Sequence, residues 1–263
     1  QLLTARETVA TQNPPPEGLQ PIINLYIQGQ LQQALSKATQ MLEKFPKSVT
    51  LYNIAGASNA GLGQLDAAID CYKQAMKINP DSIDTLNNIG NALKNKGELE
   101  ASIDFFKKAI KIKPDYAEAY FNMGVAINNK GDPEAAIVSY KKALKINSNY
   151  AEAHNNIGLI LNNMGYFQKA IVSYKKALKI NQESAVVYNN MSTAFINMGD
   201  LPAAIDSCQQ ALRINPEYAA AYYNMGIALE GKRDLKASLE CYKEALKITP
   251  DFAEAYLNMG VVL

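Results

Sequence analysis

Residues 117–150 read AEAYFNMGVAINNKGDPEAAIVSYKKALKINSNY, and residues 151–184 read AEAHNNIGLILNNMGYFQKAIVSYKKALKINQES. Both segments are 34 residues long, and small residues, aromatic residues and lysines fall at matching places. The same period relates glycines at 56, 90, 124, 158, 226 and 260 with Ser192 in the missing slot, glycines at 63, 97, 131, 165 and 199, and alanines at 75, 109, 143, 177, 211 and 245. Self-similarity at a fixed period of this length indicates a repeat array.

Each repeat reads as two helices. The run from Ala117 to Lys130 carries apolar residues at helical spacing and stops at Gly131. Asp132 can cap a second helix, and Pro133 is tolerated in its first turn. Glycine at the eighth place and alanine at the twentieth and twenty-seventh let the two helices approach closely. We expect the tyrosines of the fourth and twenty-fourth places to fill the remaining gaps as core residues.

This pattern resembles the tetratricopeptide repeat. The resemblance divides the chain into an N-terminal extension (1–16), a divergent capping repeat (17–48), six repeats (49–252) and the first helix of a truncated seventh repeat (253–263). It implies an all-α, right-handed superhelical solenoid of antiparallel helix-turn-helix units, in which the first helices line a concave groove. It also implies a role in protein–protein interaction.

Composition argues against several classes of partner. The 26 basic and 25 acidic side chains leave a formal charge of +1, so no overall field attracts nucleic acid or an anionic membrane. No apolar run approaches the roughly 20 residues of a membrane helix, and residues 1–18 lack a basic segment followed by an apolar run. Cys71, Cys208 and Cys241 form no CxxC pair, which is typical of free thiols in a reducing compartment. We therefore expect a cytoplasmic protein that binds neither nucleic acid nor membrane.

The sequence contains no constellation for catalysis. Its one histidine, His154, occupies a fourth place that other repeats fill with tyrosine, so we expect it to be packed. No nucleophile with a base, no metal-ligand cluster and no GK[ST] phosphate loop is evident. The sequence therefore predicts that this chain is not itself an enzyme and has no catalytic residues, no metal site and no cofactor.

Asparagine recurs where packing does not require it. The sixth places of successive repeats are Asn88, Asn122, Asn156, Asn190, Asn224 and Asn258. Asparagine costs a helix roughly 0.5 kcal/mol relative to alanine, and the second, sixth, ninth and thirteenth places form a stripe away from the core positions. A carboxamide both donates and accepts, so it can bind the backbone of another chain whatever its side chains are. Helices about 8–10 Å apart match the rise of three extended residues at about 3.3 Å each.

This series is similar to the asparagine ladder in the superhelical arm of O-linked N-acetylglucosamine transferase, where it holds polypeptide backbones. The match holds at the six positions and fails at Ile54. An alternative is that the amides order hydrogen bonds between repeats. A second series of asparagines lies two residues before the turn glycines: Asn95, Asn129, Asn163 and Asn197. These residues are either further peptide-binding residues or are present because asparagine suits helix C-termini. Phe121 and Tyr223, at the fifth place, are candidate anchors for partner side chains, and the acidic second places favour neutral or basic segments.

The leading hypothesis is therefore an interaction module that holds an extended polypeptide in its groove. One alternative is the substrate-recruiting arm of a larger glycosyltransferase or sulfotransferase-type enzyme, and another is a self-assembling scaffold. The seventh repeat has no second helix to cover Met259, Val262 and Leu263. Uncovered apolar ends favour stacking against another molecule, so we also expect self-association through the C-terminal end.

Overall fold

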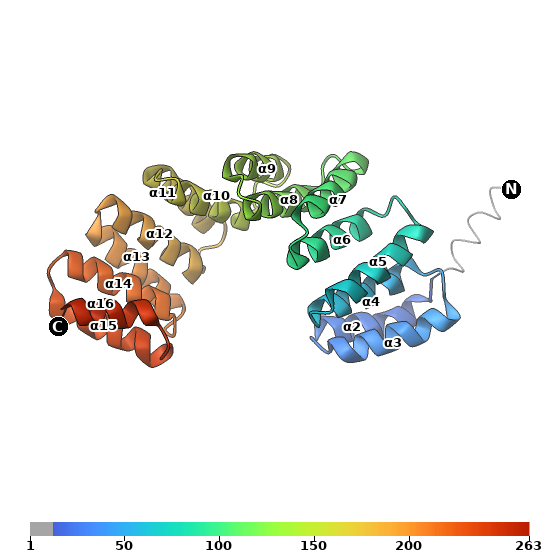
Figure 1. Ribbon diagram of the computed structural model, residues 1–263, viewed down its shortest axis with the longest axis horizontal. Coiled ribbons are helices and arrows are strands. Elements are labelled where there is room, and N and C mark those ends of the chain that lie inside the picture. Colours follow the sequence, from blue (N-terminus) through green and yellow to red (C-terminus); the bar gives the residue numbers. More distant parts are fainter. Residues whose placement is uncertain (1–12, 263) are drawn as a thin grey trace. The chain divides into compact units, whose positions relative to one another are not determined.

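The computed structural model describes residues 13–262. Within that range the chain forms α-helices joined by short loops and contains no β-strand (Figure 1). The chain divides into two compact bodies, residues 1–146 and residues 147–263, which are described separately. Most of the expected N-terminal extension, and Leu263, lie outside the described residues. The all-α class of the fold is confirmed.

The N-terminal body contains four helical hairpins. Its helices are α2 (Pro16–Ile27), α3 (Leu31–Lys44), α4 (Val49–Gly61), α5 (Leu65–Ile78), α6 (Ile83–Lys96), α7 (Leu99–Ile112), α8 (Ala117–Asn129) and α9 (Pro133–Ile146). The two helices of each hairpin pack together, and the second helix also packs on the first helix of the next hairpin. Successive first helices touch as well, so α4, α6 and α8 lie in a row. This stacking makes the body a helical solenoid.

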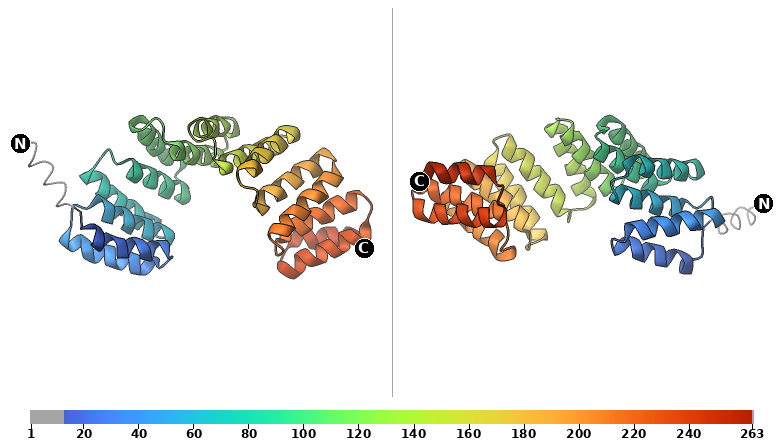
Figure 2. Two further views of the ribbon diagram at one scale, coloured as in Figure 1. Left: turned by 180° about the vertical axis from the view of Figure 1, so that it is seen from behind. Right: turned by 60° about the horizontal axis from the view of Figure 1, so that its bottom comes forward.

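The C-terminal body repeats the same arrangement. Its helices are α10 (Ala151–Asn163), α11 (Phe167–Ile180), α12 (Ala185–Met198), α13 (Leu201–Ile214), α14 (Ala219–Gly231), α15 (Leu235–Ile248) and α16 (Ala253–Val262). The first helices α10, α12, α14 and α16 contact one another in that order. Figure 2 shows the alternation of first and second helices from two further directions. We call the surface formed by the second, fifth, sixth and ninth places of these first helices the first-helix face.

Side-chain caps and turn glycines set the helix ends. Asp132 accepts a hydrogen bond from the backbone N–H of Ala135 (3.0 Å), which begins α9 as the sequence predicts. Ser184 caps α12 by accepting from the N–H of Val187 (3.4 Å). The turn between the two helices of a repeat needs a left-handed residue, and Gly131 supplies it with φ 93°. Glycine meets this requirement at little cost because it has no Cβ.

In five of the hairpins described, α4–α5, α6–α7, α8–α9, α10–α11 and α14–α15, an aromatic ring of the second helix lies on a glycine of the first. A Cβ at Gly124 would stand only 2.8 Å from the ring of Tyr140, and Tyr140 is buried. The other twenty-fourth-place rings are buried too: Tyr72, Phe106, Tyr174 and Tyr242. The core prediction is therefore confirmed for these places. It is wrong for Tyr256, at a fourth place, which is 52% exposed because no later helix covers that side of α16 in the described residues.

Candidate functional site

The sixth-place asparagines lie on consecutive first helices, and most are joined to the helix before them. In the C-terminal body, Nδ2 of Asn190 donates to Oδ1 of Asn155 (3.0 Å), which joins α12 to α10. Nδ2 of Asn224 donates to Oδ1 of Asn189 (2.9 Å), which joins α14 to α12. Each bond spans 35 residues and links a sixth place to the fifth place of the preceding repeat.

The same link takes another form at the last step. Nδ2 of Asn258 on α16 donates to the hydroxyl of Tyr223 on α14 (3.2 Å). Asn156, at the first step, lies half-buried on α10 and accepts from Nδ2 of Asn155 (3.5 Å). The fifth-place asparagines were not expected as partners of the sixth-place amides. Their signal is present in the sequence, because four fifth places carry asparagine in register: Asn53, Asn87, Asn155 and Asn189.

The N-terminal body contains two of the sixth-place asparagines, Asn88 and Asn122. Asn122 on α8 donates to Oδ1 of Asn87 on α6 (3.2 Å) and is only 8% exposed. Asn87 in turn donates to Oε1 of Glu118 (2.9 Å). Asn88 is partly buried, and its side chain forms no hydrogen bond with another described residue. Thr85 makes the link to the preceding first helix instead, by donating to Oδ1 of Asn53 (3.0 Å). The amide link between first helices therefore begins at Asn122.

These links leave part of the hydrogen-bonding capacity of each side-chain amide unused. A carboxamide nitrogen carries two hydrogens and its oxygen accepts two bonds. Asn190 and Asn258 each use one nitrogen donor, while Asn224 has three acceptors near its nitrogen, including Ser192 Oγ at 3.3 Å. Within residues 13–262, Oδ1 of Asn190, Asn224 and Asn258 accepts no hydrogen bond, and all three side chains are partly exposed. Each of these three repeats therefore presents a free carbonyl acceptor.

The second asparagine series lies at the C-terminal ends of the first helices. Asn95, Asn129, Asn163 and Asn197 are all exposed. Nδ2 of Asn197 donates to Oδ1 of Asn162 (3.3 Å), a second amide link between α12 and α10, two helical turns from the first. This link is the only hydrogen bond that a side chain of the series makes to another described residue.

The two candidate anchors are partly packed. The ring of Phe121 lies 5.5 Å from that of Tyr140, and the ring of Tyr223 lies 4.9 Å from that of Phe252 and 5.9 Å from that of Tyr242. Both remain half-exposed. Each can offer one edge of its ring to a partner. Both rings pack against aromatic side chains of the repeats and do not project from the surface.

The first-helix face of the C-terminal body carries two carboxylates, Glu152 and Glu254, both exposed at second places. Glu230, at the twelfth place, lies outside this face and accepts a hydrogen bond from the hydroxyl of Tyr242 (2.7 Å). Burial, followed by the negative charge of Glu254, raises the pKa of Tyr223. The second, fifth, sixth and ninth places of α10, α12, α14 and α16 include no lysine or arginine. The potential on this face is therefore negative.

Comparison with known proteins identifies the repeat. A model described as TPR repeat matches residues 61–97, 90–131, 128–165, 193–232 and 234–263, and a model described as tetratricopeptide repeat matches residues 151–184. The chain belongs to the tetratricopeptide repeat family. As a tetratricopeptide repeat protein it is a protein–protein interaction module. No curated protein matches the sequence.

Solved structures show the same fold. The chain is similar to the APC/C heterotetramer Cut9–Hcn1, with 16% identity and a TM-score of 0.74 over 92% of this chain and 48% of that chain. It is similar to MamA, with 28% identity and a TM-score of 0.56 over 62% of this chain and 95% of that chain. It is also similar to YrrB, described as a TPR protein with an unusual peptide-binding site, with 18% identity and a TM-score of 0.55 over 74% of this chain and 97% of that chain. The chain thus spans about half the length of the first of these relatives.

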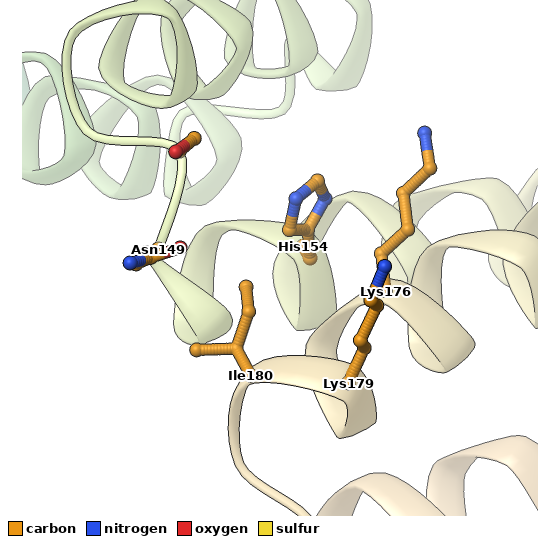
Figure 3. A pocket seen from close by; sticks show the side chains of 6 residues that line it. Asn149, His154, Lys176, Lys179 and Ile180 are labelled. Carbon is orange, nitrogen blue, oxygen red and sulfur yellow. The ribbon is translucent and has the colours of Figure 1, made fainter.

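His154 is partly buried, as are the tyrosines at the same place in other repeats: Tyr52, Tyr120, Tyr188 and Tyr222. It lines a cavity of about 430 Å³ together with Lys176, Lys179 and Ile180 (Figure 3). Burial, followed by the positive charge of Lys176, lowers the pKa of His154. Histidine is smaller than the tyrosine found at most fourth places, so it leaves this space unfilled.

The three cysteines are free; Cys208 and Cys241 are buried and Cys71 is partly buried. Burial raises the pKa of Cys208 to about 11. Across residues 13–262, no three histidine, cysteine or acidic side chains are placed to hold a metal ion. No helix in that range is long and apolar enough to cross a membrane.

Proposed function

We propose that this tetratricopeptide module binds an extended polypeptide segment along its first helices through the sixth-place asparagines. In the C-terminal body the binding residues are Asn156, Asn190, Asn224 and Asn258. The N-terminal body contributes Asn88 and Asn122 on its own row of first helices. The observation that carries the proposal is the in-register amide row, in which three successive asparagines keep a carbonyl oxygen free.

The links between repeats prepare the amides for binding. Each bonded nitrogen fixes its side chain in one rotamer, so less conformational entropy is lost when a ligand binds. First helices about 8–10 Å apart present one acceptor for every three residues of an extended chain rising about 3.3 Å per residue. A free carbonyl oxygen is a partner for the N–H that every non-proline residue carries. Recognition of this kind is independent of sequence.

Neighbouring residues can add selectivity. Phe121 and Tyr223 offer half-exposed rings at the fifth place, and aromatic anchors are common at the centre of interfaces. Asn95, Asn129, Asn163 and Asn197 are exposed along the same helices, where their amides can extend the contact with the partner. The negative first-helix face favours segments that are neutral or basic.

Two further points support a polypeptide ligand. YrrB, which shares the fold, is described as having a peptide-binding site. The asparagine series also resembles the one that holds polypeptide backbones in the arm of O-linked N-acetylglucosamine transferase. That resemblance favours a second candidate function, in which the module recruits substrate to a glycosyltransferase or sulfotransferase-type domain. The complete reading frame of the gene distinguishes a free-standing module from such an arm.

A matched pair of variants tests the proposed function. Asn224→Ala and Asn189→Ala both delete the 2.9 Å hydrogen bond between α14 and α12. Only Asn224 presents a partly exposed carbonyl, since Asn189 is 8% exposed. Each variant would be titrated with fluorescent random peptides of about twelve residues, the length that spans four first helices.

We expect Asn224→Ala to weaken peptide binding about fivefold, the effect of one hydrogen bond worth about 1 kcal/mol. Asn189→Ala should bind peptides like the wild type, because Ser192 Oγ (3.3 Å) and Thr193 Oγ1 (3.1 Å) still hold Nδ2 of Asn224. Its free energy of unfolding should nevertheless fall by about 1 kcal/mol, since the bond to Asn224 is lost. If both variants bind peptides as well as the wild type and differ from it only in melting temperature, the amide row is structural and the proposal is wrong.

A further inference from the structure

A small cavity opens beside the amide row of the C-terminal body. It measures about 210 Å³ and lies between the first turns of α10 and α12 and the end of α11. An apolar cavity of about 150 Å³ accommodates benzene, whereas pockets for drug-sized ligands measure about 300–1,000 Å³. The cavity is therefore large enough for one long side chain and smaller than the pockets that hold drug-sized ligands.

Its walls suit a side chain with an apolar stem and a charged end. Ala151, Ala177, Val186 and Val187 supply aliphatic surface, and Val186 is 52% exposed. Glu152 is the one charged residue in the lining. Its side chain is exposed and forms no ion pair or hydrogen bond within residues 13–262. By contrast, Glu118, at the same place in the preceding repeat, accepts from Asn87 and Tyr116.

The polar groups around Glu152 are already engaged as acceptors. Oδ1 of Asn181 accepts from the N–H of Glu183 (3.2 Å), and Oγ of Ser184 accepts from the N–H of Val187 (3.4 Å). Oδ1 of Asn155 accepts from Asn190. Among the polar side chains that line the cavity, only the carboxylate of Glu152 accepts no hydrogen bond within residues 13–262. An unpaired carboxylate favours a cation beside it.

The cavity is adjacent to the proposed backbone contact. Asn155 lines the cavity and also bonds to Asn190, the asparagine that would hold the ligand backbone on α12. Side chains of an extended segment point alternately to its two faces, so a residue next to the one held by Asn190 can direct its side chain toward α10. Long basic side chains bury their aliphatic stems while the charged end reaches a polar site.

We propose that this cavity receives a lysine or arginine side chain of the bound polypeptide, with Glu152 as its counter-ion. This inference rests on the proposed function and makes it specific, since it gives the ligand a basic residue at one register position. The first turns of α10 and α12 carry the partial positive charge of helix N-termini, which attracts anions. Glu152 lies in the first turn of α10 and offsets that charge, so the cavity selects against an acidic side chain.

The test uses peptide libraries of about twelve residues in which one central position is fixed and the others are random. Libraries fixed as lysine, arginine, norleucine or glutamate would be titrated against wild-type residues 1–263. We expect the lysine and arginine libraries to bind about three- to fivefold more tightly than norleucine, as for a partly exposed ion pair. The preference should shrink when ionic strength rises from about 0.1 M to about 1 M, because the Debye length falls from about 10 Å to about 3 Å.

Two variants and one control locate the effect. Glu152→Gln should remove the preference for a basic residue, and Glu152→Lys should shift it toward glutamate. Glu183→Gln makes the same charge change on an exposed residue that does not line the cavity, and it should keep the preference. The inference is overturned if Glu152→Gln retains the basic preference, or if the wild type binds all four libraries equally while Asn224→Ala still weakens binding. If the wild type binds no library at all, the proposed function fails and this inference fails with it.

Discussion

At the scale of single residues, the fifth repeat shows how two facing positions depend on each other. Other repeats place an aromatic ring on a glycine, whereas this repeat has Ser192 and Cys208, both fully buried. The Ser192 hydroxyl donates to the carbonyl of Asn189 (2.7 Å) and also lies 3.3 Å from Nδ2 of Asn224. A smaller side chain at position 208 leaves room for a side chain at position 192. The same exchange brings a hydroxyl to the amide row.

This coupling gives a prediction for stability. Cys208→Tyr alone should destabilise the chain by about 1–3 kcal/mol, because the new ring would overlap Ser192. Ser192→Gly should recover most of that loss by restoring the arrangement of Gly158 and Tyr174. Urea unfolding of the wild type, both single variants and the double variant measures the interaction energy of the pair. Additive effects would show that the two positions are independent.

At the scale of elements, the turn within each repeat requires a left-handed residue. Glycine occupies this place in six repeats, with φ between 73° and 93°: Gly29, Gly63, Gly97, Gly131, Gly165 and Gly199. In the next repeat the residue is Arg233, with φ 65°, the one non-glycine residue with positive φ in the described part of the chain. A left-handed conformation costs a residue with a Cβ about 1–2 kcal/mol. The hairpin of α14 and α15 therefore carries backbone strain.

Arg233→Gly should relieve this strain. We expect the free energy of unfolding to rise by about 1 kcal/mol. Glycine removes the steric cost of the left-handed conformation, and part of that gain is offset because glycine has more conformational freedom in the unfolded chain. Lys232→Gly is the matched control, because Lys232 has φ −81° and gains nothing from glycine. Urea midpoints compare the three proteins. A destabilised Arg233→Gly variant would mean that the arginine side chain contributes more than its backbone costs.

At the scale of the whole molecule, each repeat contacts only its neighbours, and among the described residues α16 packs on α15 and α14 alone. In α16, the last helix described, Tyr256, Leu257 and Val261 are 52%, 70% and 71% exposed. The sequence points instead to Met259 and Val262, which are partly buried, and to Leu263, which lies outside the described residues. The structure therefore exposes an apolar surface on α16, as the sequence suggests, but the exposed residues are different ones.

We expect self-association through this surface, because apolar area left in water costs about 25 cal/mol per Å². Sedimentation of residues 1–263 should show a weight-average mass that rises with concentration. The double variant Leu257→Lys with Val261→Lys should remain monomeric. Val138→Lys, which alters an exposed valine on α9, should associate like the wild type. Sedimentation of the wild type as a monomer at every concentration would contradict the expectation.

The sequence by itself determined the helices and their pairing within a hairpin. Asp132, Pro133 and the turn glycines mark helix ends through local backbone chemistry, and the glycine at the eighth place predicts a ring on it from the repeat pattern alone. These features depend on residues in one 34-residue unit, where spacing along the chain fixes spacing in space. For the same reason, the sixth-place asparagines could be placed on one stripe.

Only the tertiary structure decided what those asparagines touch. From sequence alone, replacing Asn190 by alanine should leave stability unchanged or raise it, since alanine is the better helix former. The hydrogen bond to Asn155 on the preceding first helix reverses the sign of that expectation. The free carboxylate of Glu152 and the bonded one of Glu118 occupy the same place in their repeats and differ only in their neighbours. Contacts between stacked helices depend on their relative rotation and height, which spacing within one helix does not specify.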